Sequence, residues 1–268
     1  MISTARYATP DGAMTGARIA QPDGSSATAL VFVHGVGSTA AIWDRQLEAL
    51  GDRYRCVAIE LRGNGAEQDP DPALIARAGF AQDVVTVMDA LQIERCTLVG
   101  CSLGGVVAFE LWQQGHGRFD AMVILGSFAR YPDAERYAAN VSAAVQDAGS
   151  MRVFAERRAT QLGLPPERMR ETIEQMACKS VPCYLASTQA TWTGDYTSML
   201  SSITVPALVS YGADDRVAPR ELSEAIAAGI PGADLEEVPD AGHVANADNP
   251  PAFNALLGDF LQRQPNLP

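Results

Sequence analysis

The sequence has no long apolar run, few basic residues and few histidines. No apolar stretch approaches the roughly 18 residues that a membrane-spanning helix requires, and residues 1–6 lack the apolar centre of a signal peptide. We therefore expect a soluble, cytoplasmic protein without a membrane partner. Its 20 Lys and Arg against 32 Asp and Glu give a net charge of −12, with a sequence pI near 4.6. This balance argues against nucleic-acid binding, which requires clustered basic side chains to neutralise phosphates.

Cysteine, histidine and lysine are scarce enough to limit the chemistry. The five cysteines are an odd number without the paired spacing of a metal site, so we expect reduced thiols and no metal centre. Histidine occurs only at His34, His116 and His243, and lysine only at Lys179. A reaction that needs an imidazole base therefore has three candidates.

Short apolar runs alternate with amphipathic helical patterns along most of the 268 residues. Because these runs are apolar without interruption, they are typical of parallel strands buried on both faces. The chain therefore has an α/β pattern, with a mostly parallel sheet and helices on both faces. The predicted strands are 30–33, 55–59, 96–99, 121–125, 207–211 and, more weakly, 235–238. Residues 5–7 and 17–19 flank a turn-forming Pro-Asp-Gly and predict an N-terminal hairpin.

The alternation breaks between residues 128 and 202, where helical patterns continue without a convincing buried strand. We interpret this segment as a helical cap inserted over the strand ends, which divides the core domain into residues 1–127 and 203–268. The segment contains eight basic and eight acidic residues. Such a balance is typical of an ordinary solvated surface, and the alternative is a less acidic region that admits an anionic substrate. Within it, Tyr184 and Trp192 are candidates either for the substrate pocket or for the core of the cap.

A glycine-flanked serine stands between an apolar strand and a helical pattern. The segment from Gly100 to Gly104 has the form G-x-S-x-G, with Ser102 at its centre. A nucleophile on a tight, strained turn needs this spacing, because glycines let the neighbouring backbone pass close by. The adjacent Cys101 should point away from the exposed apex, and we expect it to pack in the core.

A serine nucleophile needs a base and a carboxylate that orients it. His243 lies in a loop after the last strand and before the helix predicted over 251–261, whereas His34 and His116 fit that position less well. Two adjacent aspartates, Asp214 and Asp215, follow the strand 207–211. Serine, acid and histidine thus occur in the chain order expected for such a sheet. Spacing does not choose between the two aspartates.

Two main-chain N–H groups are candidates to stabilise an oxyanion. The N–H of Leu103 lies at the N-terminus of the helix that follows Ser102. The second donor is expected from the glycine-containing loop after the first buried strand, at Val36. The neighbouring Gly35 is assigned to substrate binding.

These motifs together resemble the α/β-hydrolase family. The resemblance rests on His34-Gly35, on Arg62-Gly63-Asn64-Gly65, on Gly100–Gly104, on the spacing of Gly212, Asp215 and Pro219, and on Gly242-His243. The family's late acidic motif favours Asp215, with Asp214 as the alternate. Within the family, residues 205–209, 241–246 and, loosely, 184–187 are most similar to 3-oxoadipate enol-lactonases. Haloalkane dehalogenases and epoxide hydrolases fit less well, because they have an aspartate where this chain has Ser102.

The resemblance implies a serine hydrolase that cleaves a small-molecule ester or lactone through Ser102, His243 and Asp215, without a cofactor. A homodimer is left open. The alternatives are a non-hydrolytic enzyme on the same scaffold, such as a C–C or C–N lyase or a cofactor-free oxygenase, and a catalytically silent receptor for a small ligand.

Overall fold

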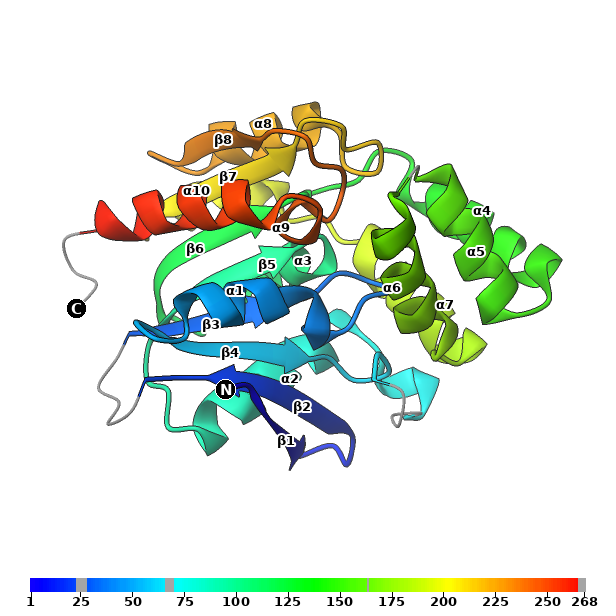
Figure 1. Cartoon of the computed structure of the whole chain (residues 1–268), viewed down its shortest axis with the longest axis horizontal. Coiled ribbons are helices and arrows are strands. Elements are labelled where there is room, and N and C mark those ends of the chain that lie inside the picture. Colours follow the sequence, from blue (N-terminus) through cyan, green and yellow to red (C-terminus); the bar gives the residue numbers. More distant parts are fainter. Residues whose placement is uncertain (23–27, 66–69, 163, 265–268) are drawn as a thin grey trace.

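A computed structural model describes residues 1–22, 28–65, 70–162 and 164–264, and its central feature is one eight-stranded sheet (Figure 1). The strand order is β1-β2-β4-β3-β5-β6-β7-β8. The first two strands form the predicted hairpin and pair antiparallel, and β2 also pairs antiparallel with β4. All other neighbours are parallel. The strands are β1 Ser3–Ala8, β2 Met14–Ala20, β3 Ala29–Val33, β4 Arg55–Glu60, β5 Cys96–Cys101, β6 Phe119–Leu125, β7 Ala207–Gly212 and β8 Asp234–Val238.

Helices cover both faces of this sheet, as the sequence predicts. One apolar core lies between the sheet and the helices α2, α3 and α8. A second core lies on the opposite face, under α1 and α10. The helices outside residues 128–202 are α1 Asp44–Leu50, α2 Arg77–Ala90, α3 Leu103–Gln113, α8 Arg220–Gly229, α9 Ala245–Asp248 and α10 Pro250–Gln262. Two short 3-10 turns, η1 Ala40–Trp43 and η2 Pro72–Leu74, precede α1 and α2.

The buried centre of the sheet explains its strong sequence signal. Strands β3, β5 and β7 are buried at every position, which requires apolar side chains on both faces. The edge strand β8 is exposed at its middle positions, and the corresponding run is the weakest in the sequence. The α/β architecture is therefore correctly predicted by the continuous apolar runs.

Between β6 and β7 the described chain forms helices and no named strand. These elements are α4 Ala134–Ala148, α5 Met151–Gln161, α6 Pro166–Ala177, α7 Val181–Trp192 and the 3-10 turn η3 Thr197–Ser202. Figure 1 shows α4–α7 together at the end of the sheet to which the β4 arrow points. In the described ranges, no helix combines the length and apolarity that crossing a bilayer demands.

A buried arginine holds the turn after β4 in place. The guanidinium of Arg62 is fully buried. Its Nε donates a hydrogen bond to Oδ1 of Asp83 in α2 at 2.9 Å. The main-chain N–H of Arg62 donates to the other oxygen of Asp83, Oδ2, at 2.8 Å. Arg62 Nη1 also contacts Asp11 at 2.5 Å, and this hydrogen bond lowers the pKa of the Asp11 carboxyl to about 2. One cation thus connects the N-terminal hairpin, the turn after β4 and α2.

The substitution Arg62→Met should destabilise the fold strongly. It removes the partner of Asp83 and leaves a buried carboxylate, so the free energy of unfolding should fall by about 3–5 kcal/mol. Urea denaturation followed by circular dichroism measures this change. As a control, Arg220→Met removes an exposed arginine that pairs with Glu224 and should leave the midpoint unchanged. Equal midpoints for the two variants would contradict the role of Arg62.

Candidate active site

Ser102 lies on the tight turn between β5 and α3. Its φ of 53° and ψ of −112° place a non-glycine residue in a sparsely populated backbone region. Such a conformation costs on the order of 1–3 kcal/mol and persists only where the surroundings enforce it. The strand and the helix on either side enforce it here, so the serine is held at the end of β5 as the motif predicts.

Two glycines make the approach of α3 to the sheet possible. A Cβ on Gly104 would lie 2.1 Å from the carbonyl oxygen of Val33 in β3, and a Cβ on Gly100 would lie 2.3 Å from the carbonyl oxygen of Gly104. Any side chain at either position would push the helix away from the strands. The glycine spacing is therefore a packing requirement of this turn.

The structure brings Ser102, His243 and Asp215 into one hydrogen-bonded chain. His243 Nε2 lies 3.1 Å from Ser102 Oγ, and His243 Nδ1 lies 2.8 Å from Asp215 Oδ2. The other oxygen of Asp215 accepts the N–H groups of Val217 at 2.8 Å and Ala218 at 2.9 Å. The carboxylate is thus fixed from both sides and turned toward the imidazole. The arrangement suits proton transfer from the serine hydroxyl to Nε2, with Nδ1–H donated to the carboxylate.

Asp214 occupies a different position from Asp215. It is exposed and lines the pocket in front of His243. Consecutive side chains leave the backbone in different directions, so only one of the pair meets the imidazole. In the structure that residue is Asp215, which the family motif favours and spacing does not distinguish.

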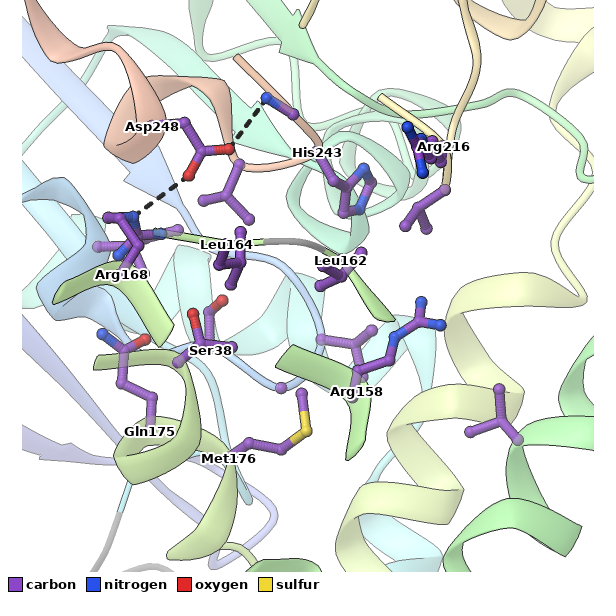
Figure 2. A pocket seen from close by; sticks show the side chains of 18 of the residues that line it. Ser38, Arg158, Leu162, Leu164, Arg168, Gln175, Met176, Arg216, His243 and Asp248 are labelled. Carbon is purple, nitrogen blue, oxygen red and sulfur yellow. Dashed lines mark hydrogen bonds and ion pairs between the residues drawn. The ribbon is translucent and has the colours of Figure 1, made fainter. Parts of the chain in front are cut away.

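Asp248 holds the loop that carries His243, and the sequence analysis did not identify it. Its Oδ2 accepts the Gly242 N–H at 3.1 Å, and its Oδ1 accepts Arg168 Nε of α6 at 3.2 Å (Figure 2). Gly242, the residue before His243, is thereby connected through Asp248 to α6, a helix of the 128–202 segment. An aspartate six residues after Gly242 has no motif of its own, so only the folded chain reveals this contact.

His34 supports the loop of residues 34–40, which we call loop 34–40. The Leu61 N–H donates to His34 Nε2 at 3.2 Å, so Nδ1 carries the proton and donates to the Gly35 carbonyl at 2.8 Å. The Gly35 carbonyl and the Val36 N–H belong to one trans peptide and point in opposite directions. Holding the carbonyl therefore also fixes the direction of the Val36 N–H.

The two main-chain donors named from the sequence are available. In the described part of the chain, neither the Val36 nor the Leu103 N–H has an acceptor. Val36 lines the pocket, and Gly35 lies against the nucleophile, because a Cβ there would be 3.2 Å from the Cβ of Ser102. Gly35 itself does not line the pocket, so its position is that of a close packing partner of Ser102.

Cys101 is buried beside Ser102, and its thiol is unreactive. Burial raises the pKa of its thiol well above the usual range, so the reactive thiolate is strongly disfavoured. All five cysteines are free thiols.

A pocket lies between His243 and the helices α4–α7, and Figure 2 shows its lining side chains. Tyr184 and Trp192, the two candidates named from the sequence, both line it, although each is almost fully buried. Trp192 also belongs to an aromatic cluster, stacked on Phe128 at 4.9 Å and 4.3 Å from the ring of Tyr137. Trp192 therefore lies in the wall of this pocket and in an aromatic cluster at the same time.

Three arginines that the sequence did not assign line this pocket, beside Asp214 and Asp248. Arg158, Arg168 and Arg216 all line it. Arg168 is paired with Asp248 and Glu171. Arg158 donates to the Tyr137 hydroxyl at 3.1 Å and, among the described residues, has no acidic partner. The described residues contain no group of three or more His, Cys, Asp or Glu that could hold a metal ion.

Comparisons with known proteins agree with this fold. The profile of the Alpha/beta hydrolase family matches residues 30–256. A putative carbamate hydrolase of Variovorax paradoxus (strain S110) is 29% identical over 245 residues, covering 88% of this chain and 92% of that protein. The 3-oxoadipate enol-lactonase 2 of Acinetobacter baylyi is 28% identical over 242 residues, covering 88% and 89%. A crystal structure of a hydrolase from Pseudomonas aeruginosa PA01 superposes with a TM-score of 0.84 at 30% identity, covering 97% of this chain and 98% of that one. The family and the enol-lactonase likeness inferred from the motifs are confirmed.

The substitution Gly104→Ala should disrupt the turn at Ser102. Since the added Cβ would collide with the Val33 carbonyl, we expect a lower melting temperature and the loss of Ser102 labelling by a fluorophosphonate. Labelling is followed by intact-protein mass spectrometry. Gly117→Ala is the matched control, because its Cβ meets nothing within 4 Å. Labelling of Gly104→Ala at the wild-type rate would refute the packing argument.

Proposed function

The chain belongs to the alpha/beta hydrolase family, and on that premise we propose that it is a serine hydrolase acting on a carboxylic ester or lactone of a small molecule. The observation that supports this most strongly is the hydrogen-bonded series of Ser102, His243 and Asp215, of which His243 lines the pocket. A hydroxyl, an imidazole and a carboxylate in this order form an activated nucleophile with its base.

In the first step, His243 Nε2 removes the proton of Ser102 while Oγ attacks the carbonyl carbon. Asp215 keeps Nδ1–H oriented and stabilises the imidazolium that forms. The Val36 and Leu103 N–H groups donate to the developing oxyanion, assisted by the N-terminal end of the α3 dipole. His243 then returns the proton to the leaving oxygen, and the C–O bond breaks to leave an acyl group on Ser102.

In the second step, His243 activates water that attacks the acyl group. The oxyanion is held by the same donors, and the collapse of the intermediate returns the proton to Ser102. No metal or organic cofactor takes part in this scheme.

The pocket favours a small substrate. Its cavity of about 100 Å³ is small for a ligand site. Residues 128–202 act as a cap in this proposal, because α4–α7 contribute much of the wall opposite His243. A lactone would need no exit for a separate leaving alcohol, because its leaving oxygen stays attached to the acyl group and the product departs as one hydroxy acid.

A carbamate is the second candidate substrate. The relative in Variovorax paradoxus is named a putative carbamate hydrolase, and a carbamate carbonyl could be attacked by the same residues. Turnover of matched ester, lactone and carbamate substrates separates these classes.

An anionic group on the substrate fits the arginines of the pocket. The protein carries a net charge of −12, yet the pocket contains the guanidinium of Arg158 without an acidic partner among the described residues. A carboxylate on the substrate could supply that partner. This favours the second of the two sequence interpretations of the charge-balanced segment, an entrance for anions.

Replacing the nucleophile should abolish hydrolysis. Ser102→Ala removes the attacking oxygen, so a folded variant should lose turnover of p-nitrophenyl acetate, measured by release of p-nitrophenol. Cys101→Ala removes the neighbouring thiol instead and should keep most of the activity. Full activity in Ser102→Ala would exclude the proposed mechanism.

Removing the guanidinium of Arg158 should weaken only the binding of anionic substrates. A hydrogen bond to a charged group is worth about 1.5–3 kcal/mol, so Arg158→Met should raise KM about tenfold or more for the p-nitrophenyl monoester of succinic acid. KM for neutral p-nitrophenyl acetate should stay the same. Arg157→Met, which removes an exposed arginine paired with Asp147, is the control. An equal effect of Arg158→Met on both esters would contradict an anion subsite.

A further inference from the structure

Lys179 is a buried cation that the proposed reaction does not use. It follows α6, is the only lysine of the chain, and has 5% of its surface exposed. Its Nζ donates hydrogen bonds to two main-chain carbonyl oxygens, that of Ser38 at 2.9 Å and that of Asn64 at 2.5 Å. Within the described ranges, no carboxylate forms an ion pair with it. A buried ammonium is costly unless its donors are hydrogen-bonded. The carbonyls of Ser38 and Asn64 therefore stabilise the buried Lys179 ammonium.

Ser38 belongs to loop 34–40, and side chains from outside the loop bond three consecutive residues of it. The contacts are Lys179 Nζ to the Ser38 carbonyl at 2.9 Å, the Thr39 N–H to Gln175 Oε1 at 3.2 Å, and the Ala40 N–H to Glu60 Oε2 at 3.1 Å. His34 holds the other end of the loop through the Gly35 carbonyl. Val36 lies between these two sets of contacts, so its N–H is placed by both.

Helix α6 connects this loop to the pocket. Gln175 lies near the end of α6 and Lys179 in the turn after it. The same helix lines the pocket with Arg168, Thr172 and Met176, which recur at the spacing of one helical face. Met176 also packs on the loop, since its Cε would lie 2.8 Å from a Cβ on Gly37. A ligand in the pocket therefore contacts the helix that ends at the Lys179 turn.

The charges around Lys179 keep it largely protonated near neutral pH. Burial lowers the pKa of the ammonium to about 8, and the carboxylate of Glu60 on β4 opposes that shift. The Glu60 Oε1 atom in turn lies 3.2 Å from His34 Nε2, and the thiol of Cys178 is the other titratable group near Lys179. Lys179, Glu60 and His34 thus form one group of ionisable side chains behind loop 34–40.

We propose that Lys179 is a positioning residue that fixes loop 34–40 through the Ser38 carbonyl and so aligns the Val36 N–H with Ser102. Through this contact the pocket-lining face of α6 is coupled to the oxyanion donor. The inference rests on the proposed serine hydrolase function, because it assigns Val36 to the oxyanion. A donor displaced by about 1 Å costs up to about a hundredfold in rate. Losing the hydrogen bond from Lys179 to the Ser38 carbonyl should therefore lower kcat.

The test is Lys179→Met, which keeps the length of the side chain and removes its charge and its donors. We expect kcat for p-nitrophenyl acetate to fall about tenfold or more, with KM nearly unchanged because the pocket wall remains. Hydrogen exchange of the amides of residues 36–40, measured by mass spectrometry, should speed up more than exchange elsewhere. Arg152→Met is the matched control. It also removes one positive charge and a contact to α6, through exposed Glu174, and it should leave kcat and loop exchange as in the wild type.

A wild-type kcat together with unchanged exchange at residues 36–40 would overturn the proposal. A uniform rise in exchange with a wild-type kcat per folded molecule would show a general stabilising role and would overturn it as well. If Lys179→Met does not fold, Lys179→Arg keeps the charge and the donors but changes their reach. This variant should lower kcat and leave KM unchanged, and a wild-type kcat would count against the proposal.

Ser102→Ala measured in parallel separates the role of Lys179 from the hydrolase function itself. If Ser102→Ala retains hydrolysis, the proposed serine hydrolase function is wrong, and hydrogen exchange of residues 36–40 alone decides whether Lys179 positions the loop.

Discussion

The close approach of α3 to the central strands is the constraint on which the rest of the site depends. Gly104 lies so near the Val33 carbonyl that no side chain fits between them, and Ser102 takes a strained conformation as a result. The strain is tolerated because β3, β5 and the first two turns of α3, residues 103–109, are buried around it. A rigid scaffold thus holds one hydroxyl at the end of β5, and three loops are arranged around it: loop 34–40 and the loops that carry Asp215 and His243.

These loops are themselves held by polar contacts, and each contact comes from a distant part of the sequence. Asp248 holds Gly242 next to His243, and His34 holds the Gly35 carbonyl. Helix α6 contacts both sides of the site, through Arg168 on Asp248 and through Gln175 and the adjoining Lys179 on loop 34–40. The 128–202 segment therefore contributes to the geometry around Ser102 as well as to the wall of the pocket. For the proposed hydrolase, this arrangement couples substrate binding to catalysis through packing and hydrogen bonds.

Much of the fold and the tight turn at Ser102 could be predicted from the sequence, because the sequence patterns that indicate them are local. Continuous apolar runs identify strands buried on both faces, and the glycine spacing around Ser102 reports a backbone approach at that position. The choice between Asp214 and Asp215 was not local, since it depends on which carboxylate meets the imidazole of the distant His243. Asp248, Lys179 and Arg158 were not assigned for the same reason. An acidic or basic residue has no periodicity that reveals its partner, and their partners lie on other elements.

The central claim is that Ser102 becomes acylated during turnover, and this can be observed directly. The protein is mixed with p-nitrophenyl acetate, quenched in acid during steady-state turnover, digested and mapped by mass spectrometry. The mechanism predicts an acetyl group on the peptide that contains Ser102, at Ser102 and not at Cys101, and its absence when His243 is replaced by Ala. Turnover without any acetylated peptide, or with the acetyl group on another residue, would contradict the mechanism.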